Sequence, residues 1–187
     1  YKRLKNVVSD CEDRYDLIER QIAGLCDEKL LKEKLSRDFL DRMEGYLVEL
    51  EDSLMNFRDV EHRGVVKKEQ EIIELFYFKF MDIPLLSRMD AVAEYFIDEV
   101  ETLKGFDLPD EEREAVKSRF YRMYETRDLY VLYNRFLKQE GFPPLPQVQY
   151  EKRKLRYEDV YPVLYLKYRL ETQQEDSGVR HLIVDEM

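Results

Sequence analysis

Residues 40–57, Leu-Asp-Arg-Met-Glu-Gly-Tyr-Leu-Val-Glu-Leu-Glu-Asp-Ser-Leu-Met-Asn-Phe, decide the fold class of this chain. Apolar side chains recur there in steps of three and four, with charged residues between them, at Leu40, Met43, Leu47, Leu50, Leu54 and Phe57. This spacing lays one apolar stripe along a helix. The sequence therefore predicts a mainly α protein.

A second stripe with the same spacing comes earlier, at Val8, Cys11, Tyr15, Ile18, Ile22 and Leu25. The phase of the pattern changes between the two stripes, which indicates a break near residues 24–27. Two amphipathic helices joined by a turn bury their stripes against each other. We therefore expect a long helical hairpin over residues 1–63.

Residues 65–141 predict a bundle of further helices. The first of them, over residues 65–81, is apolar nearly all round and should be buried, after a loop at residues 60–64. Proline suits the first turn of a helix, and glycine commonly ends one. The later helix boundaries are therefore expected at Pro84, Gly105, Pro109 and Gly141.

The segment Phe-Pro-Pro-Leu-Pro at residues 142–146 marks the clearest internal boundary, because its prolines cannot all lie in a helix. Residues 142–187 should form a return segment with a different character. A helix is expected from Glu158, and the apolar run at residues 181–184 has the composition of a short buried strand.

The composition limits what the chain can do. Charged residues make up 39% of the 187 residues, which indicates helices with solvated faces, and the net charge is −10. So acidic a chain should not bind nucleic acid strongly by itself, because phosphate binding needs clustered Lys and Arg. No apolar run approaches the ~20 residues of a membrane span. Two cysteines fit a reducing compartment, so we expect a cytoplasmic protein without a membrane segment.

One short basic cluster stands out against this acidity, formed by Lys152, Arg153, Lys154 and Arg156 and flanked by two tyrosines. Basic residues interleaved with aromatic ones can bind single-stranded nucleic acid through charge and stacking. A short charge run more often lies on a solvated approach to a helix. The pattern favours that second interpretation, and these four residues remain nucleic-acid candidates.

The last residues carry the clearest chemical pattern. A buried strand followed by Asp185 and Glu186 matches the Walker B arrangement, in which the strand delivers two acids to a nucleotide crevice. The first acid helps to hold Mg²⁺ at the phosphates, and the next orients or deprotonates the attacking water. Taken alone, the pattern is weak, because acids follow buried strands for many reasons.

The stretch from Arg156 through Tyr157-Glu158-Asp159 to Met187 resembles UvrD/Rep-type superfamily 1 helicases of the HelD-like branch. The resemblance implies that the last strand belongs to a RecA-like ATPase domain, and that residues 1–141 form a helical insertion ahead of it. It also implies Asp185 as the Mg²⁺-associated acid, Glu186 as the catalytic glutamate, ATP as cofactor, and DNA or RNA polymerase as partner of the parent protein.

The chain departs from that family in one respect, because it contains no Walker A loop, Gly-x-x-x-x-Gly-Lys-Ser/Thr. We therefore expect a piece of a longer motor protein that binds neither ATP nor Mg²⁺ unaided. The alternative is a stand-alone acidic helical module that binds other proteins and has no enzymatic activity.

Overall fold

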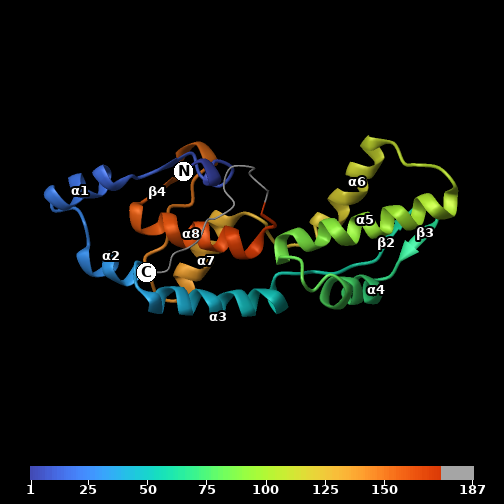
Figure 1. Cartoon of the computed structure of the whole chain (residues 1–187), viewed down its shortest axis with the longest axis horizontal. Coiled ribbons are helices and arrows are strands. Elements are labelled where there is room, and N and C mark those ends of the chain that lie inside the picture. Colours follow the sequence, from blue (N-terminus) through green and yellow to red (C-terminus); the bar gives the residue numbers. More distant parts are fainter. Residues whose placement is uncertain (174–187) are drawn as a thin grey trace.

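The computed structural model describes residues 1–173, which form eight α-helices and two small sheets (Figure 1). The helices are α1 (Arg14–Ile22), α2 (Glu28–Lys34), α3 (Arg37–Ser53), α4 (Glu69–Glu74), α5 (Leu85–Lys104), α6 (Asp110–Tyr121), α7 (Leu129–Gln139) and α8 (Tyr157–Leu170). The strands β1 (Asp10–Cys11) and β4 (Lys154–Leu155) pair in parallel, and β2 (Val60–His62) and β3 (Val65–Lys67) pair antiparallel. The predicted mainly α class is confirmed.

The helices are arranged in two lobes that lie end to end along an elongated molecule (Figure 1). The base lobe contains α1, α2, α3, α7 and α8 together with β1 and β4. The distal lobe contains β2, β3, α4, α5 and α6, so it is inserted between α3 and α7 of the base lobe.

Two connections join the lobes: an outgoing strand around residues 54–56 and a returning strand around residues 123–125. They run side by side and form a narrow neck. Met55 and Tyr124 form an antiparallel bridge. The Asn56 N–H donates to the Met123 carbonyl at 2.7 Å, and the Glu125 N–H donates to the Leu54 carbonyl at 2.9 Å. The buried apolar side chains of the described residues form one cluster that continues through both lobes. The outgoing and returning strands are therefore fixed to each other at the point where the lobes meet.

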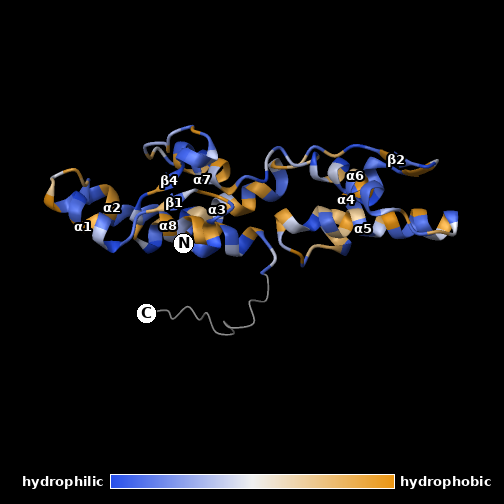
Figure 2. Ribbon diagram, turned by 90° about the horizontal axis from the view of Figure 1, so that it is seen from above, coloured by the Kyte–Doolittle hydropathy of each residue, from blue (hydrophilic) through white to orange (hydrophobic). Residues whose placement is uncertain are grey.

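The stripe predicted at residues 40–57 forms α3 as far as Ser53, while Leu54 and Phe57 lie beyond the end of the helix, and the helix turns its apolar side chains to the core. Phe39, Met43, Leu47 and Leu50 are buried. The Ser36 hydroxyl accepts from the Phe39 N–H at 3.2 Å and so begins the helix. Figure 2 shows hydrophobic and hydrophilic residues alternating along the helices, as amphipathic packing requires.

The expected hairpin over residues 1–63 is corrected by the structure. Residues 8–25 are not one helix, because Asp13 caps a new helix at Arg14 and Gly24 ends it with a φ of 71°. Cys11 belongs to β1, which pairs with β4, and α1 packs on α8 instead of α3. Tyr15, Ile18, Ile22 and Leu25 are consequently exposed.

Residues 60–81 also differ from the prediction. The expected loop and the start of the expected helix form the β2–β3 hairpin, whose turn places Arg63 and Gly64 at positive φ. A helix follows as α4 and a π-helical turn, η2 (Leu75–Lys79). Phe76 is fully buried there, but Phe78 is exposed, so this helix is not buried all round.

The later boundaries agree with the prediction. α5 ends at Gly105, whose φ of 79° lies in the left-handed region that glycine adopts without strain. α6 begins after Pro109, α7 ends at Gln139 just before Gly141, and residues 142–146 lie outside helices and strands. The expected strand at residues 181–184 lies outside the described residues.

The helical insertion is predicted to end at residue 141 and to divide internally at residue 63. Both boundaries remain predictions about a larger protein. Among residues 1–173, no helix combines the length and the apolar character that crossing a bilayer requires.

Candidate functional site

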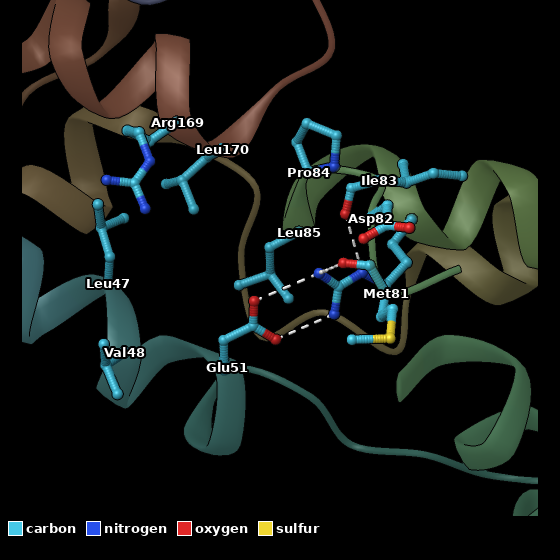
Figure 3. Close-up of a pocket in the computed structure, with 11 residues that line it drawn as sticks. Leu47, Val48, Glu51, Met81, Asp82, Ile83, Pro84, Leu85, Arg169 and Leu170 are labelled. Atoms are coloured by element: carbon cyan, nitrogen blue, oxygen red, sulfur yellow. Dashed lines mark hydrogen bonds and ion pairs between the residues drawn. The ribbon is translucent and has the colours of Figure 1, made fainter. Parts of the chain in front are cut away.

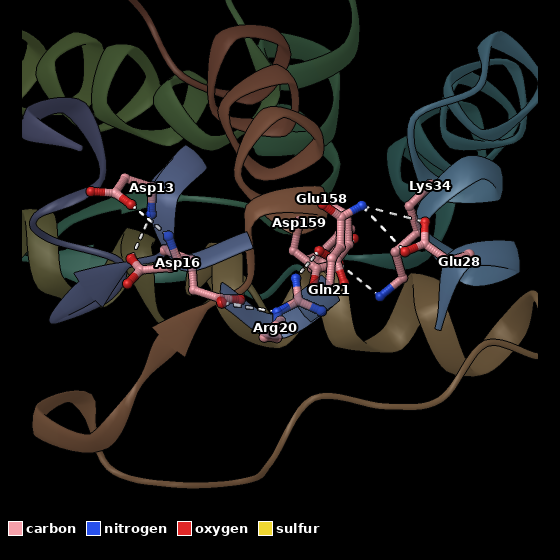
Figure 4. Close-up of polar contacts among 10 residues, drawn as sticks. Asp13, Asp16, Arg20, Gln21, Glu28, Lys34, Glu158 and Asp159 are labelled. Atoms are coloured by element: carbon pink, nitrogen blue, oxygen red, sulfur yellow. Dashed lines mark hydrogen bonds and ion pairs between the residues drawn. The ribbon is translucent and has the colours of Figure 1, made fainter. Parts of the chain in front are cut away.

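The Tyr157-Glu158-Asp159 motif lies at the first turn of α8, and both of its acids are buried (Figure 4). The Lys34 Nζ lies 2.8 Å from Asp159 Oδ1, and the Tyr133 hydroxyl donates to the same oxygen at 2.5 Å. Burial, with Asp159 adding to it, raises the pKa of Tyr133 well above its usual value, so this hydroxyl stays protonated and donates. One carboxylate thus joins α2, α7 and α8.

Glu158 makes a second link beside the first. The Arg20 Nη2 donates to Glu158 at 2.6 Å, and its Nε donates to Glu12 at 3.0 Å (Figure 4). These contacts attach α1 and the segment after β1 to α8. The acids of the motif are therefore neutralised by cations of the same chain, and their role here is structural.

The predicted basic cluster divides into different environments. Arg153 makes a two-pronged ion pair with Asp128, donates to the Val7 carbonyl, and stacks 4.4 Å from the centre of the Tyr130 ring. Lys154 lies 3.4 Å from Asp10. Lys152 and Arg156 are exposed. Arg153 thus serves the base lobe, and a nucleic-acid contact through the others stays a prediction.

The predicted catalytic and metal residues, Glu186 and Asp185, lie outside the described residues, as does any site for ATP and Mg²⁺ built on them. Among residues 1–173, no group of three or more His, Cys, Asp or Glu side chains could hold a metal ion.

A hollow of about 280 Å³ lies where the two lobes meet (Figure 3). α3 contributes Leu47, Val48 and Glu51, the segment before α5 contributes Met81 to Pro84, and the end of α8 contributes Arg169 and Leu170. Its volume is near the lower limit of ligand pockets, about 300 Å³. A single side chain of a partner protein would fit such a space better than a nucleotide.

Arg88 forms the polar wall of this hollow and joins the lobes. Its guanidinium donates to both carboxylate oxygens of Glu51, at 2.9 and 3.3 Å, and to the carbonyls of Met81 and Ile83 (Figure 3). It also lies 4.8 Å from the centre of the buried Phe76 ring. This contact ties α5 of the distal lobe to α3 of the base lobe.

The segment of the distal lobe that runs out along α5 and back into α6 is strongly acidic. Between Asp90 and Glu114, ten residues are acidic and two are basic. Glu112 is neutralised there by the β2–β3 turn: Arg63 donates to both of its oxygens, at 2.5 and 2.9 Å, and His62 Nε2 lies 2.5 Å from one of them. Others, such as Asp98, Asp107 and Glu114, are exposed and have no ion-pair partner among the described residues. This segment can offer negative charge to a basic surface.

Sequence reasoning missed the residues that make these contacts. Lys34 and Arg20 occupy positions in short amphipathic helices where a solvated cation is the usual interpretation, and Arg88 lies inside the predicted helix at residues 84–105. The only signal in the sequence was a Lys or Arg at a helix position that the helical period places on the buried side.

Comparison with known proteins adds no relative, because no family model, curated protein or solved structure matches this chain. The resemblance to superfamily 1 helicases therefore depends on the quoted residues alone.

We expect Lys34→Met to lower the free energy of unfolding by about 3–5 kcal/mol, because Asp159 would stay buried without its cation. Adding Asp159→Asn should recover most of the loss, since a neutral amide still accepts from Tyr133. Urea unfolding measures both. The control, Arg42→Ala, removes exposed ion pairs and should cost under about 1 kcal/mol. A Lys34→Met cost no larger than that of the control would contradict the structural role.

Hydrogen bonds from Arg63, and then from His62, outweigh partial desolvation and lower the pKa of Glu112 from 4.5 to about 2. Its contribution to stability is therefore complete above pH 4.5 and is lost as the pH falls towards 2. Glu112→Gln should reduce the drop in melting temperature between pH 5 and pH 2, measured by circular dichroism. The neighbouring, exposed Glu111→Gln should leave that drop unchanged. Equal drops in all three proteins would rule out the stabilising role of Glu112.

Proposed function

We propose that this chain is a helical interaction arm of an ATP-driven superfamily 1 motor, and that it works in the cytoplasm. The observation that best supports an interaction arm is the nested architecture of the chain. The distal lobe leaves and re-enters the base lobe through one neck, while the parallel pairing of β1 and β4 holds an early and a late segment of the chain together. A segment inserted into a larger domain needs its ends close together, and the base lobe provides this.

The shape and the charge support a contact role for the distal lobe. It extends from the base lobe along the long axis of the molecule (Figure 1). The exposed acidic residues along α5 and α6 favour a basic partner surface and would be repelled by DNA. RNA polymerase, which has a basic DNA-binding surface, is the partner proposed for the parent protein, and DNA is the track of its motor.

The motor half of the proposal depends on the resemblance around Asp185 and Glu186. In the parent protein, Asp185 would hold Mg²⁺ and Glu186 would orient the attacking water on ATP. Walker A is absent from this chain, so the upstream part of the parent must supply the phosphate loop.

The second candidate is a stand-alone interaction module without enzymatic activity. One observation favours it: the acids of the Tyr157-Glu158-Asp159 motif find their partners within this chain, and so need no neighbouring domain to neutralise them.

The motor is tested with the full-length parent protein and its Glu186→Gln variant. We expect ATP hydrolysis that single-stranded DNA or RNA polymerase stimulates, and a fall of at least ~100-fold in kcat with the substitution. Arg42→Ala, at an exposed helix position, should hydrolyse ATP like the parent. A parent without ATPase activity, or one insensitive to Glu186→Gln, would favour the stand-alone module.

The arm is tested by reversing three exposed acids of the distal lobe, Asp98, Asp107 and Glu114, to lysine. Affinity for RNA polymerase, measured by surface plasmon resonance at 0.1 M salt, should fall at least tenfold, because the attraction to a basic surface becomes repulsion. The matched control reverses Glu19, Glu33 and Asp41 of the base lobe, which changes the net charge equally. If both triple variants weaken binding alike, the distal lobe is not the contact.

A further inference from the structure

The molecule has a second hollow, of about 390 Å³, between the end of α6 and the returning strand of the neck. It is lined by Ser118, Tyr121, Arg122, Tyr124, Thr126 and Arg127. This hollow is larger in volume than the one at the lobe junction, and every residue that lines it carries a hydrogen-bonding or charged group.

Two arginines supply the charge of this hollow. The nearest carboxylates along the chain are already engaged: Glu125 pairs with Arg135, and Asp128 pairs with Arg153. Within residues 1–173, neither Arg122 nor Arg127 forms an ion pair, although acidic residues outnumber basic ones by ten in the sequence. Each guanidinium has five N–H donors, and those facing solvent are available to an anion.

The Tyr121 ring, which lines the hollow, restricts the position of Arg127. The Arg127 guanidinium lies 4.2 Å from the centre of the Tyr121 ring, a stacking contact that limits its freedom. The Tyr121 hydroxyl donates to Asp90 at 2.5 Å. Burial and Asp90 raise the pKa of Tyr121, so this side chain stays neutral and adds no negative charge to the hollow.

Further donors surround the arginines. Thr126 Oγ1 accepts from the Asp128 N–H at 3.1 Å, which leaves its own proton free to donate. Arg58 reaches the edge from the outgoing strand of the neck, where its Nη2 donates to the Arg122 carbonyl at 3.4 Å. The hydroxyl of Ser118 has no hydrogen-bond partner among the described residues.

From these contacts we propose that the hollow binds a phosphate monoester, presented as a phosphorylated side chain of a partner protein. Two guanidiniums and two hydroxyls offer more donors than a carboxylate can accept, and they match the three oxygens and nearly double charge of a phosphate group. Arg clusters commonly recognise phosphorylated segments in this way.

A nucleic acid is a poorer ligand for this site. The Tyr121 ring, which could otherwise stack on a base, is covered by Arg127. Asp90 and Glu114 lie close enough to raise the pKa of Tyr121, so a chain of phosphates leaving the hollow on that side would meet negative charge.

The test uses the whole 187-residue chain and a fluorescent Gly/Ala-rich peptide with one central phosphoserine, followed by anisotropy at 0.1 M NaCl. The phosphopeptide should bind, and the same peptide with serine or glutamate at that position should bind at least tenfold more weakly. The double variant R122A/R127A should weaken phosphopeptide binding at least tenfold. R14A/R37A, which removes two exposed arginines elsewhere, is the charge-matched control and should bind normally.

In nuclear magnetic resonance spectra, the amide signals of Ser118 and Thr126, which also line the hollow, should move on titration with phosphoserine, and the same two signals should not move when R122A/R127A is titrated. Circular dichroism checks that each variant remains folded. Three results would overturn the proposal: no phosphopeptide binding, equal weakening by the two double variants, or an arginine-dependent affinity for oligo(dT) at least as high as for the phosphopeptide.

Discussion

The base lobe depends on one buried carboxylate, that of Asp159. A charged group with no exposure to water destabilises a fold unless cations and donors surround it, and those partners must come from other elements. Lys34 of α2 and Tyr133 of α7 supply them. Both partners reach the same oxygen, Oδ1, at the first turn of α8, so this one carboxylate holds the three helices in a fixed arrangement, while its Oδ2 is buried without a hydrogen-bond partner among the described residues.

The neck extends this constraint to the distal lobe. α3 follows directly after α2, and α7 follows directly after the returning strand, so fixing α2 and α7 against α8 also fixes the ends of the neck. Arg88 then joins α5 to Glu51 of α3, and the Tyr77 hydroxyl donates to the Glu51 backbone carbonyl at 2.7 Å. With one apolar core running through both lobes, the direction of the distal lobe is set by packing as well as by chain connection.

Charge is distributed unevenly along this frame. The distal lobe collects unpaired acids on α5 and α6, whereas the neck keeps arginines that no carboxylate of the described residues neutralises. Other cations are used internally in both lobes, as Arg20 and Lys34 are in the base lobe and Lys67 and Arg113 are in the distal lobe. The charged residues that hold the fold are therefore distinct from the exposed charged residues on which the proposed interaction arm depends.

Elements whose signals are local could be predicted from the sequence. The period of residues 40–57 predicted α3, Pro84 and Gly105 bounded α5, and the prolines at residues 142–146 predicted an extended connector. A local signal failed at residues 8–25, where a helical spacing spans a strand, a helix and a loop, because the pairing of β1 with β4 overrides it. The pairing of Lys34 with Asp159 and of Arg20 with Glu158 could not be predicted in this way, since the partners lie 125 and 138 residues apart and meet through the packing of the helices. An amphipathic pattern shows which side of a helix is apolar, but which distant charge a buried cation meets depends on how the helices pack.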